Sequence, residues 1–222
     1  MKRKIFIFLV ISILGICVGC NKNSYAIDFK KEYESINGET GKSGKIHRTV
    51  KIDNDNPYEK TTIKNIIEKI ENKETFYVYF GDKLCPWCRS VIEKSIEVAK
   101  NNKINKIYYV AIWDDDGNEV VRDKYELVDG EVRKTIDGDE NYPKLLELFD
   151  ELLSDYNLTD SDGNKVSTNE KRIYAPNFIY VENGISKKIE TGISEKQTDS
   201  REELTKEILE DEEELFNKFF KK

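Results

Sequence analysis

The residues of this chain best suited to chemistry are Cys85 and Cys88, which are separated by a proline and a tryptophan. A run of aromatic and branched residues, Phe76 to Phe80, precedes them and is typical of a buried strand. After the pair, apolar residues recur at the spacing of one helix face as far as Ala99. Two thiols at the point where a strand passes into a helix can exchange a disulfide with another molecule.

The predicted helix start assigns a different role to each thiol. Pro86 suits the first helical position, because the N–H that proline lacks would have no partner there. Cys85 then stands at the N-cap, where free backbone N–H groups and the helix dipole favour a negative sulfur. We therefore expect Cys85 to be a nucleophile of lowered pKa. Cys88 lies one turn further in, and we expect it to resolve a mixed disulfide formed at Cys85.

Two other uses of the cysteine pair remain as alternatives. A structural disulfide between them would close almost no loop, so its entropic contribution would be small. A zinc site would need two further ligands, and His47 is the single histidine of the chain. Redox exchange is favoured over a stapling disulfide and over a metal site, and it requires neither a metal nor an organic cofactor.

The first 20 residues have the pattern of a targeting segment. A basic start is followed by an apolar run from Ile5 to Val18, which is short for a membrane span. The end of the run resembles a bacterial lipoprotein signal, because Cys20 follows the small residue Gly19, although Cys17 stands where such signals usually carry leucine. The resemblance implies a lipid on Cys20 and a protein held at the extracytoplasmic face of the cell membrane. An uncleaved anchor and plain secretion are the alternatives.

The net charge argues against one class of partner, and the number of cysteines indicates how the thiols are used. The chain of 222 residues has a net charge of -7, which argues against nucleic acid because phosphate binding relies on clustered Lys and Arg. If Cys17 leaves with the signal and Cys20 carries lipid, two thiols remain. A single close pair in a secreted protein favours exchange over stapling.

The remaining pattern predicts a flexible tether at 21–44, rich in Lys, Asn, Ser, Gly and Glu, and one domain at 45–222. The elements expected in the domain are a strand at 45–52, a helix that follows Asn56-Pro57 and carries Ile63, Ile66, Ile67 and Ile70, a strand at 106–113, a strand hairpin at 173–191, and a terminal helix begun by a capping box of Ser200 and Glu203.

Residues 114–172 form a separate stretch between these elements. Asp129-Gly130 predicts a hairpin turn, and Pro143 opens a helix with an apolar stripe. The stripe consists of Leu145, Leu146, Phe149, Leu152 and Leu153. It is most simply a packing face, and a groove for a partner is the alternative.

The order of elements, the Cys85-Pro86-Trp87-Cys88 motif and the Ala175-Pro176 pair before a hairpin resemble the thioredoxin fold. The similarity covers about residues 45–113 and 173–220, with 114–172 inserted after the third strand. It implies an α/β fold with a central mixed sheet flanked by helices, and a cis Pro176 beside the cysteine motif. It also implies that an extended substrate pairs with the backbone of Ala175. Pro86 and Trp87 would border the same docking edge.

The sequence departs from that family at two places. Tyr79 stands where thioredoxin carries a buried aspartate, and no histidine lies inside the cysteine pair. Asp82 and Lys83 are nearer candidates for proton handling, with solvated loop charges as the simpler interpretation.

Taken together, the residues and the resemblance predict a membrane-tethered thiol–disulfide oxidoreductase. Its expected partners are cysteine-containing proteins and a membrane or extracytoplasmic redox protein. The chain also looks like extracytoplasmic thioredoxin-like proteins of bacteria, including those accessory to bacteriocin export. A thioredoxin-fold binding subunit of an export system is therefore the alternative.

Overall fold

The computed structural model describes residues 20–221, with side chains from residue 24 onward. The predicted signal segment therefore lies outside the described residues, except that the backbone of Cys20 is the first residue of a helix. No helix within this described part is both long enough and apolar enough to cross a membrane.

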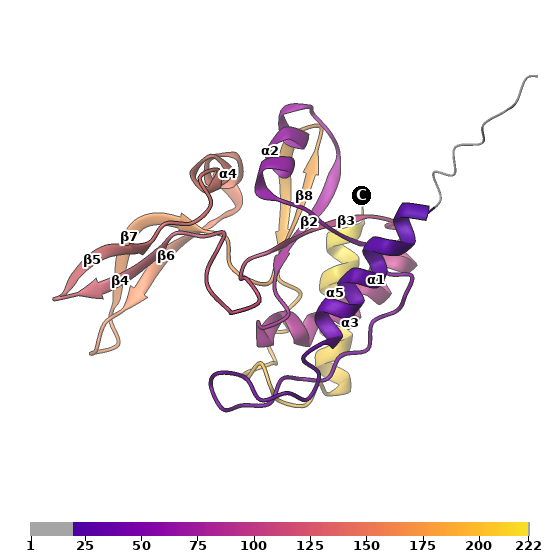
Figure 1. Cartoon of the computed structure of the whole chain (residues 1–222), viewed down its shortest axis with the longest axis horizontal. Helices are drawn as coiled ribbons and strands as arrows, with labels where there is room; N and C mark the ends of the chain where they lie inside the picture. Colours follow the sequence, from indigo (N-terminus) through magenta and orange to yellow (C-terminus); the bar gives the residue numbers. More distant parts are fainter. Residues whose placement is uncertain (1–19, 222) are drawn as a thin grey trace, which may run out of the picture.

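A five-stranded mixed sheet forms the centre of the molecule, as the sequence predicts (Figure 1). Its strand order is β1 (Tyr58–Lys60), β3 (Ile107–Ala111), β2 (Phe76–Gly81), β8 (Asn177–Glu182) and β9 (Ile185–Glu190). The first three of these are mutually parallel, and β8 and β9 run antiparallel to their neighbours. This arrangement confirms the α/β class and is consistent with a thioredoxin-like fold.

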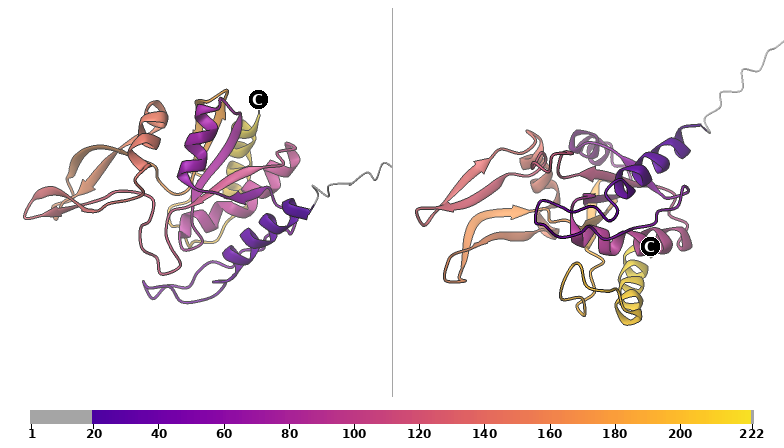
Figure 2. Two further views of the ribbon diagram at one scale, coloured as in Figure 1. Left: turned by 45° about the horizontal axis from the view of Figure 1, so that its top comes forward. Right: turned by 60° about the horizontal axis from the view of Figure 1, so that its bottom comes forward.

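Helices cover both faces of the sheet (Figures 1 and 2). Helices α1 (Cys20–Glu34), α3 (Pro86–Asn101) and α5 (Lys206–Phe220) cover one face, and α2 (Ile63–Glu71) and α4 (Tyr142–Phe149) cover the other. Strand β2 serves both cores, because successive side chains point to opposite faces. Tyr77 and Tyr79 face the first core, while Val78 and Phe80 face the second.

The structure differs from the expected tether at 21–44, because α1 occupies much of that segment and packs against the sheet. Ala26, Phe29 and Tyr33 lie on one face of this helix and are buried. The ring of Phe29 stacks on Tyr58 of β1 with centroids 4.3 Å apart. The polar composition of this segment predicted a tether and not a helix, since only these few apolar residues at helical spacing hold the helix to the core.

The strand expected at 45–52 is also wrong, since the first strand is β1. Val50 and Ile52 are buried as an alternating strand would require. However, side chains and not a neighbouring strand satisfy their backbone N–H groups. Val50 N–H donates to Asn37 Oδ1 at 3.0 Å, and Ile52 N–H donates to Glu34 Oε1 at 2.8 Å.

Two helix starts differ from those expected. Helix α2 buries its four isoleucines as predicted, but Thr62 caps it and β1 separates it from Asn56-Pro57. Helix α5 begins at Lys206, where the Thr205 side chain accepts from Ile208 N–H at 3.3 Å. A side-chain acceptor next to the apolar run decides the start in each case.

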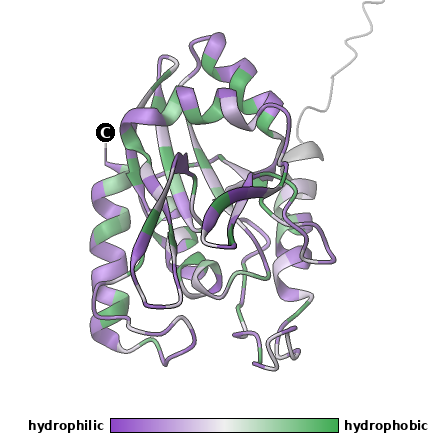
Figure 3. Cartoon of the chain, turned by 90° about the vertical axis from the view of Figure 1, so that its left-hand side faces the viewer, coloured by the Kyte–Doolittle hydropathy of each residue, from purple (hydrophilic) through white to green (hydrophobic). Residues whose placement is uncertain are grey.

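The insertion after β3 contains two hairpins, one before α4 and one after it along the chain. They are β4 (Lys124–Val128) with β5 (Glu131–Ile136), and β6 (Ser154–Thr159) with β7 (Lys165–Arg172). Both project from the body of the molecule (Figure 1) and carry mainly hydrophilic residues (Figure 3). Leu145, Phe149 and Leu153 are buried in the second core, so the apolar stripe is a packing face.

Candidate functional site

Cys85 is the N-cap of α3, and Pro86 is its first residue, as the sequence predicts. Strand β2 ends at Gly81, and a short turn closed by Cys85 N–H to the Asp82 carbonyl, at 3.2 Å, leads into the helix. The sulfur of Cys85 accepts a hydrogen bond from Cys88 N–H at 3.2 Å. The N-cap sulfur thus receives the backbone donor that a helix start leaves unpaired.

The two thiols differ in acidity and in access. Hydrogen bonding from Cys88 lowers the pKa of Cys85 in spite of burial, whereas burial raises the pKa of Cys88 well above its usual value. Cys85 keeps 4% of its surface exposed and Cys88 none, so an incoming sulfur meets Cys85 first. This asymmetry is what a nucleophile and a resolving thiol require.

The Ala175-Pro176 peptide bond is cis and lies beside the cysteine pair. The Cys85 sulfur is 3.5 Å from the carbonyl oxygen of Ala175. Strand pairing explains this proximity, because β8 runs antiparallel to β2 with Phe80 opposite Asn177. Trp87 and Ala175 are both partly buried against the first core. The tertiary structure therefore brings together the residues predicted for docking.

Asp82 is a buried carboxyl group next to the dithiol, and the interpretation as a solvated loop charge is wrong for it. Its oxygens accept from Leu84 N–H at 2.8 Å and from Trp113 N–H at 3.3 Å. Burial raises the pKa of Asp82 to about 7, although both hydrogen bonds act to lower it. Lys83 instead pairs with the exposed carboxylate of Asp115 at 2.5 Å.

Two tyrosines complete the surroundings of Cys88. Tyr79 on β2 and Tyr33 on α1 are both fully buried, and their hydroxyl oxygens are 2.8 Å apart. Tyr79 and Cys88 lie in the same buried core, and the Tyr79 hydroxyl acts to lower the pKa of Cys88. Sequence reasoning missed Tyr33, because it lies in the segment expected to be a tether.

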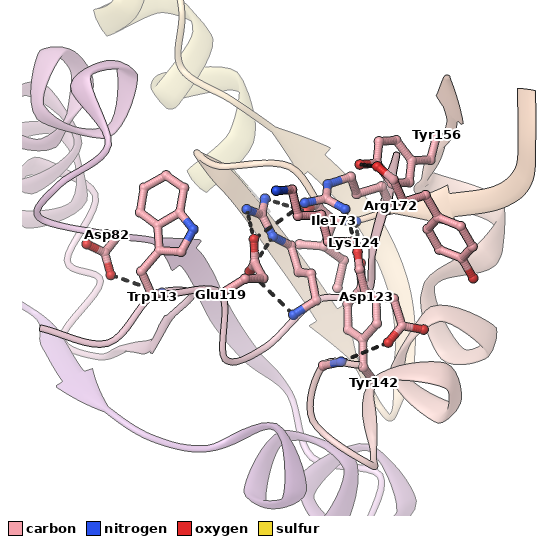
Figure 4. Close-up of polar contacts among 12 residues, drawn as sticks. Asp82, Trp113, Glu119, Asp123, Lys124, Tyr142, Tyr156, Arg172 and Ile173 are labelled. Carbon is pink, nitrogen blue, oxygen red and sulfur yellow. Dashed lines mark hydrogen bonds and ion pairs between the residues drawn. The ribbon is translucent and has the colours of Figure 1, made fainter. Parts of the chain in front are cut away.

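A buried ion-pair network joins the insertion to the chain before Ala175 (Figure 4). Glu119 accepts from Arg122 Nε at 2.9 Å and lies 3.4 Å from a guanidinium nitrogen of Arg172. Arg122 also donates to the Ile173 carbonyl at 3.2 Å and lies over the ring of Trp113. The network therefore links Trp113, which contacts Asp82, to the segment that leads into the cis bond. No sequence motif indicates it, since its members are charges in a polar stretch.

Within residues 20–221, no group of three or more His, Cys, Asp or Glu side chains is placed to hold a metal ion. No protein-family model matches the chain, and no curated protein matches it. The likeness to thioredoxin therefore rests on the sheet order, the cysteine pair at the start of α3, and the cis bond opposite it.

Proposed function

We propose that this protein is a membrane-tethered thiol–disulfide oxidoreductase that acts on protein cysteines outside the cytoplasm. The observation that carries the proposal is the position of the Cys85 sulfur, at a helix N-cap and 3.5 Å from the backbone of Ala175. The N-cap favours the thiolate, and the backbone beside it offers a partner for an extended substrate.

The proposed reaction has two exchange steps. In the first, the Cys85 thiolate attacks one sulfur of a substrate disulfide, a Cys85–substrate bond forms, and the other substrate sulfur leaves with the electron pair. In the second, Cys88 attacks the Cys85 sulfur, the Cys85–Cys88 disulfide forms, and the substrate leaves as a thiol with the proton of Cys88. Two electrons pass from the dithiol to the substrate, and the reverse sequence oxidises substrate thiols.

The docking edge of the proposed enzyme consists of the Ala175 backbone, Pro176, Pro86 and Trp87. Trp87 supplies apolar area at the rim of the site, where an aromatic side chain gives contact at small entropic cost. The tether is the proposed lipid on Cys20, whose backbone opens α1.

Trapping tests the proposal directly. In Cys88→Ser the second step cannot occur, so substrates should accumulate as mixed disulfides on Cys85 that thiol reductants release. Cys85→Ser is the matched control and should trap nothing. The intact protein should also reduce insulin disulfides. If neither trapped substrates nor insulin turnover is found, the proposal is wrong.

The direction of transfer can be measured by titration against glutathione. Because no histidine lies inside the pair and Asp82 opposes the Cys85 thiolate, we expect a potential below about -120 mV, the value of strong oxidants. A potential at or above that value would contradict this expectation.

The hairpins favour a second candidate, a binding subunit of an export system. They and α4 border a groove of about 910 Å³. Its charged lining consists of the carboxylates of Asp123, Glu147, Asp150, Asp155 and Glu170 and the amines of Lys134 and Lys171. A protein that lacks both thiols should then recover one stable partner in a pull-down. This result, together with no trapped substrates, would favour this candidate over the enzyme.

A further inference from the structure

We propose that the hydroxyl of Tyr79, held in place by the hydroxyl of Tyr33, donates the hydrogen bond that stabilises the Cys88 thiolate as it resolves the mixed disulfide. This inference rests on the proposed exchange chemistry and adds two residues to its machinery. Tyr79 would be a catalytic residue, because the proposed hydrogen bond joins its hydroxyl to the reacting sulfur. Tyr33 would be a positioning residue.

The ring of Tyr79 is fixed within the first core. It stacks between Tyr109 and Phe178, with centroids 5.6 and 4.5 Å away. Gly81, two residues further along β2, leaves the space that the phenol fills. A Cβ atom at position 81 would lie 2.1 Å from the Tyr79 hydroxyl oxygen. The phenol therefore extends along its own strand toward Gly81 at the end of β2, within the core that also buries Cys88.

Two polar groups act on the buried thiol of Cys88. One is the Tyr79 hydroxyl and the other is the backbone N–H of Asp82. Both lower the pKa of Cys88, while burial acts in the opposite direction and prevails. An anion without solvent depends on such donors, because an unpaired buried charge is costly.

The charge state of Cys88 sets the direction of the two hydrogen bonds made by the tyrosine hydroxyls. A thiolate can only accept, so Tyr79 must donate to it, and the Tyr79 oxygen is then available to accept from Tyr33. Burial raises the pKa of both tyrosines well above the usual value, so they stay protonated and act as donors, not bases. Two hydroxyl groups in series polarise each other, which strengthens the bond to sulfur.

The step that benefits is the second exchange. Cys88 must become a thiolate to attack the Cys85 sulfur, and its proton leaves with the substrate thiol. The first exchange uses the Cys85 thiolate, whose donors are the backbone N–H groups of Cys88 and Trp87. Loss of the Tyr79 hydroxyl should therefore slow resolution and leave the first attack unchanged.

An aromatic disulfide, 5,5′-dithiobis(2-nitrobenzoate), separates the two steps in one trace. Attack by Cys85 releases the first coloured thiol, and resolution by Cys88 releases the second. In the full-length Tyr79→Phe protein we expect the second phase to slow about five-fold, the value of one buried hydrogen bond, with the first phase unchanged. Tyr33→Phe should slow the second phase by a smaller factor. A protein with both Cys85→Ser and Cys88→Ser gives the background signal of the probe.

Tyr109→Phe is the matched control. Tyr109 is equally buried in the same aromatic stack, but its hydroxyl donates to Glu32 at 2.9 Å and not to sulfur. It should lose stability without slowing either phase. The inference is wrong if Tyr79→Phe leaves the second phase at the wild-type rate, or if it slows both phases equally. Because a small disulfide is the probe, this result is independent of whether protein substrates are trapped.

Discussion

The sulfur of Cys85 lies 3.5 Å from the carbonyl oxygen of Ala175, although the two residues are 90 positions apart in the chain. The antiparallel pairing of β2 with β8 creates this relationship. It places a helix N-cap thiol beside the backbone that leads into β8, which is the arrangement that disulfide exchange with a peptide segment needs.

Asp82→Asn should change the pH dependence of Cys85. Burial raises the pKa of Asp82 to about 7, and its charge raises the pKa of Cys85. Asp82 ionises as pH rises through about 7 and then opposes the thiolate, so the rate of Cys85 alkylation should show an inflection there. The inflection should be absent in Asp82→Asn.

The measurement is the rate of iodoacetamide labelling between pH 5 and 9 in a Cys88→Ser background. Asp115→Asn removes a nearby carboxylate that is exposed and paired with Lys83, so it should keep the inflection. An inflection that persists in Asp82→Asn would show that another group is responsible.

Trp87→Ala should weaken the docking of protein substrates. Trp87 is partly buried beside the cysteine pair, and a truncated aromatic anchor typically costs a factor of about ten or more in affinity. We expect KM for reduction of a protein disulfide to rise, while the rate with a small aromatic disulfide stays near that of the wild type. Equal losses for both substrates would mean that Trp87 acts on the dithiol and not on docking.

Glu119→Ala should destabilise the base of the insertion. Glu119 holds Arg122 and Arg172, and all three side chains are at least nine-tenths buried, so its removal leaves two guanidinium groups without a carboxylate partner. Breaking a buried pair in this way costs about 3–5 kcal/mol. Denaturant unfolding measures the loss.

The control for this variant is Glu126→Ala. Glu126 pairs with Lys124 at 2.9 Å, but both side chains are more than 40% exposed. Its loss should therefore change the free energy of unfolding by no more than about 0.5 kcal/mol. If the free energy of unfolding falls in Glu119→Ala by as little as in the control, water must solvate the two guanidinium groups in place of the carboxylate.

Glu212→Gln should flatten the pH dependence of stability. Glu212 is fully buried on α5, and neither of its oxygens has a hydrogen-bond partner within the described chain. Burial raises its pKa from 4.5 to about 8, opposed by the charges of Lys94 and Arg48. Between these pH values the folded protein keeps a proton that the unfolded chain releases. Stability should therefore fall as pH rises through this range, by at most about 5 kcal/mol.

Unfolding free energies at pH 5 and pH 8 test this prediction. The fall between them should be smaller in Glu212→Gln than in the wild type. The fall should be as large in Glu213→Gln as in the wild type, because the Glu213 side chain is 47% exposed and is not desolvated as Glu212 is. An equal fall in all three proteins would rule out Glu212 as the titrating group.

The sequence by itself determined the features that depend on neighbours within one or two turns. Cys85 caps α3 with Pro86 behind it because free N–H groups and the missing proline donor are local properties. The isoleucines of α2 and the Asp129-Gly130 turn followed from periodicity and turn chemistry in the same way. The resemblance to thioredoxin also gave the cis bond at Pro176.

Only the tertiary structure decided which groups surround the sulfurs. Asp82 reads as a loop charge in the sequence, and it is buried because the segment after β3 covers it and Trp113 N–H binds it. Tyr33 reads as part of a tether, and it reaches Tyr79 because α1 packs on the sheet. Burial, and with it the pKa of a buried group, depends on distant segments that meet only in the folded chain.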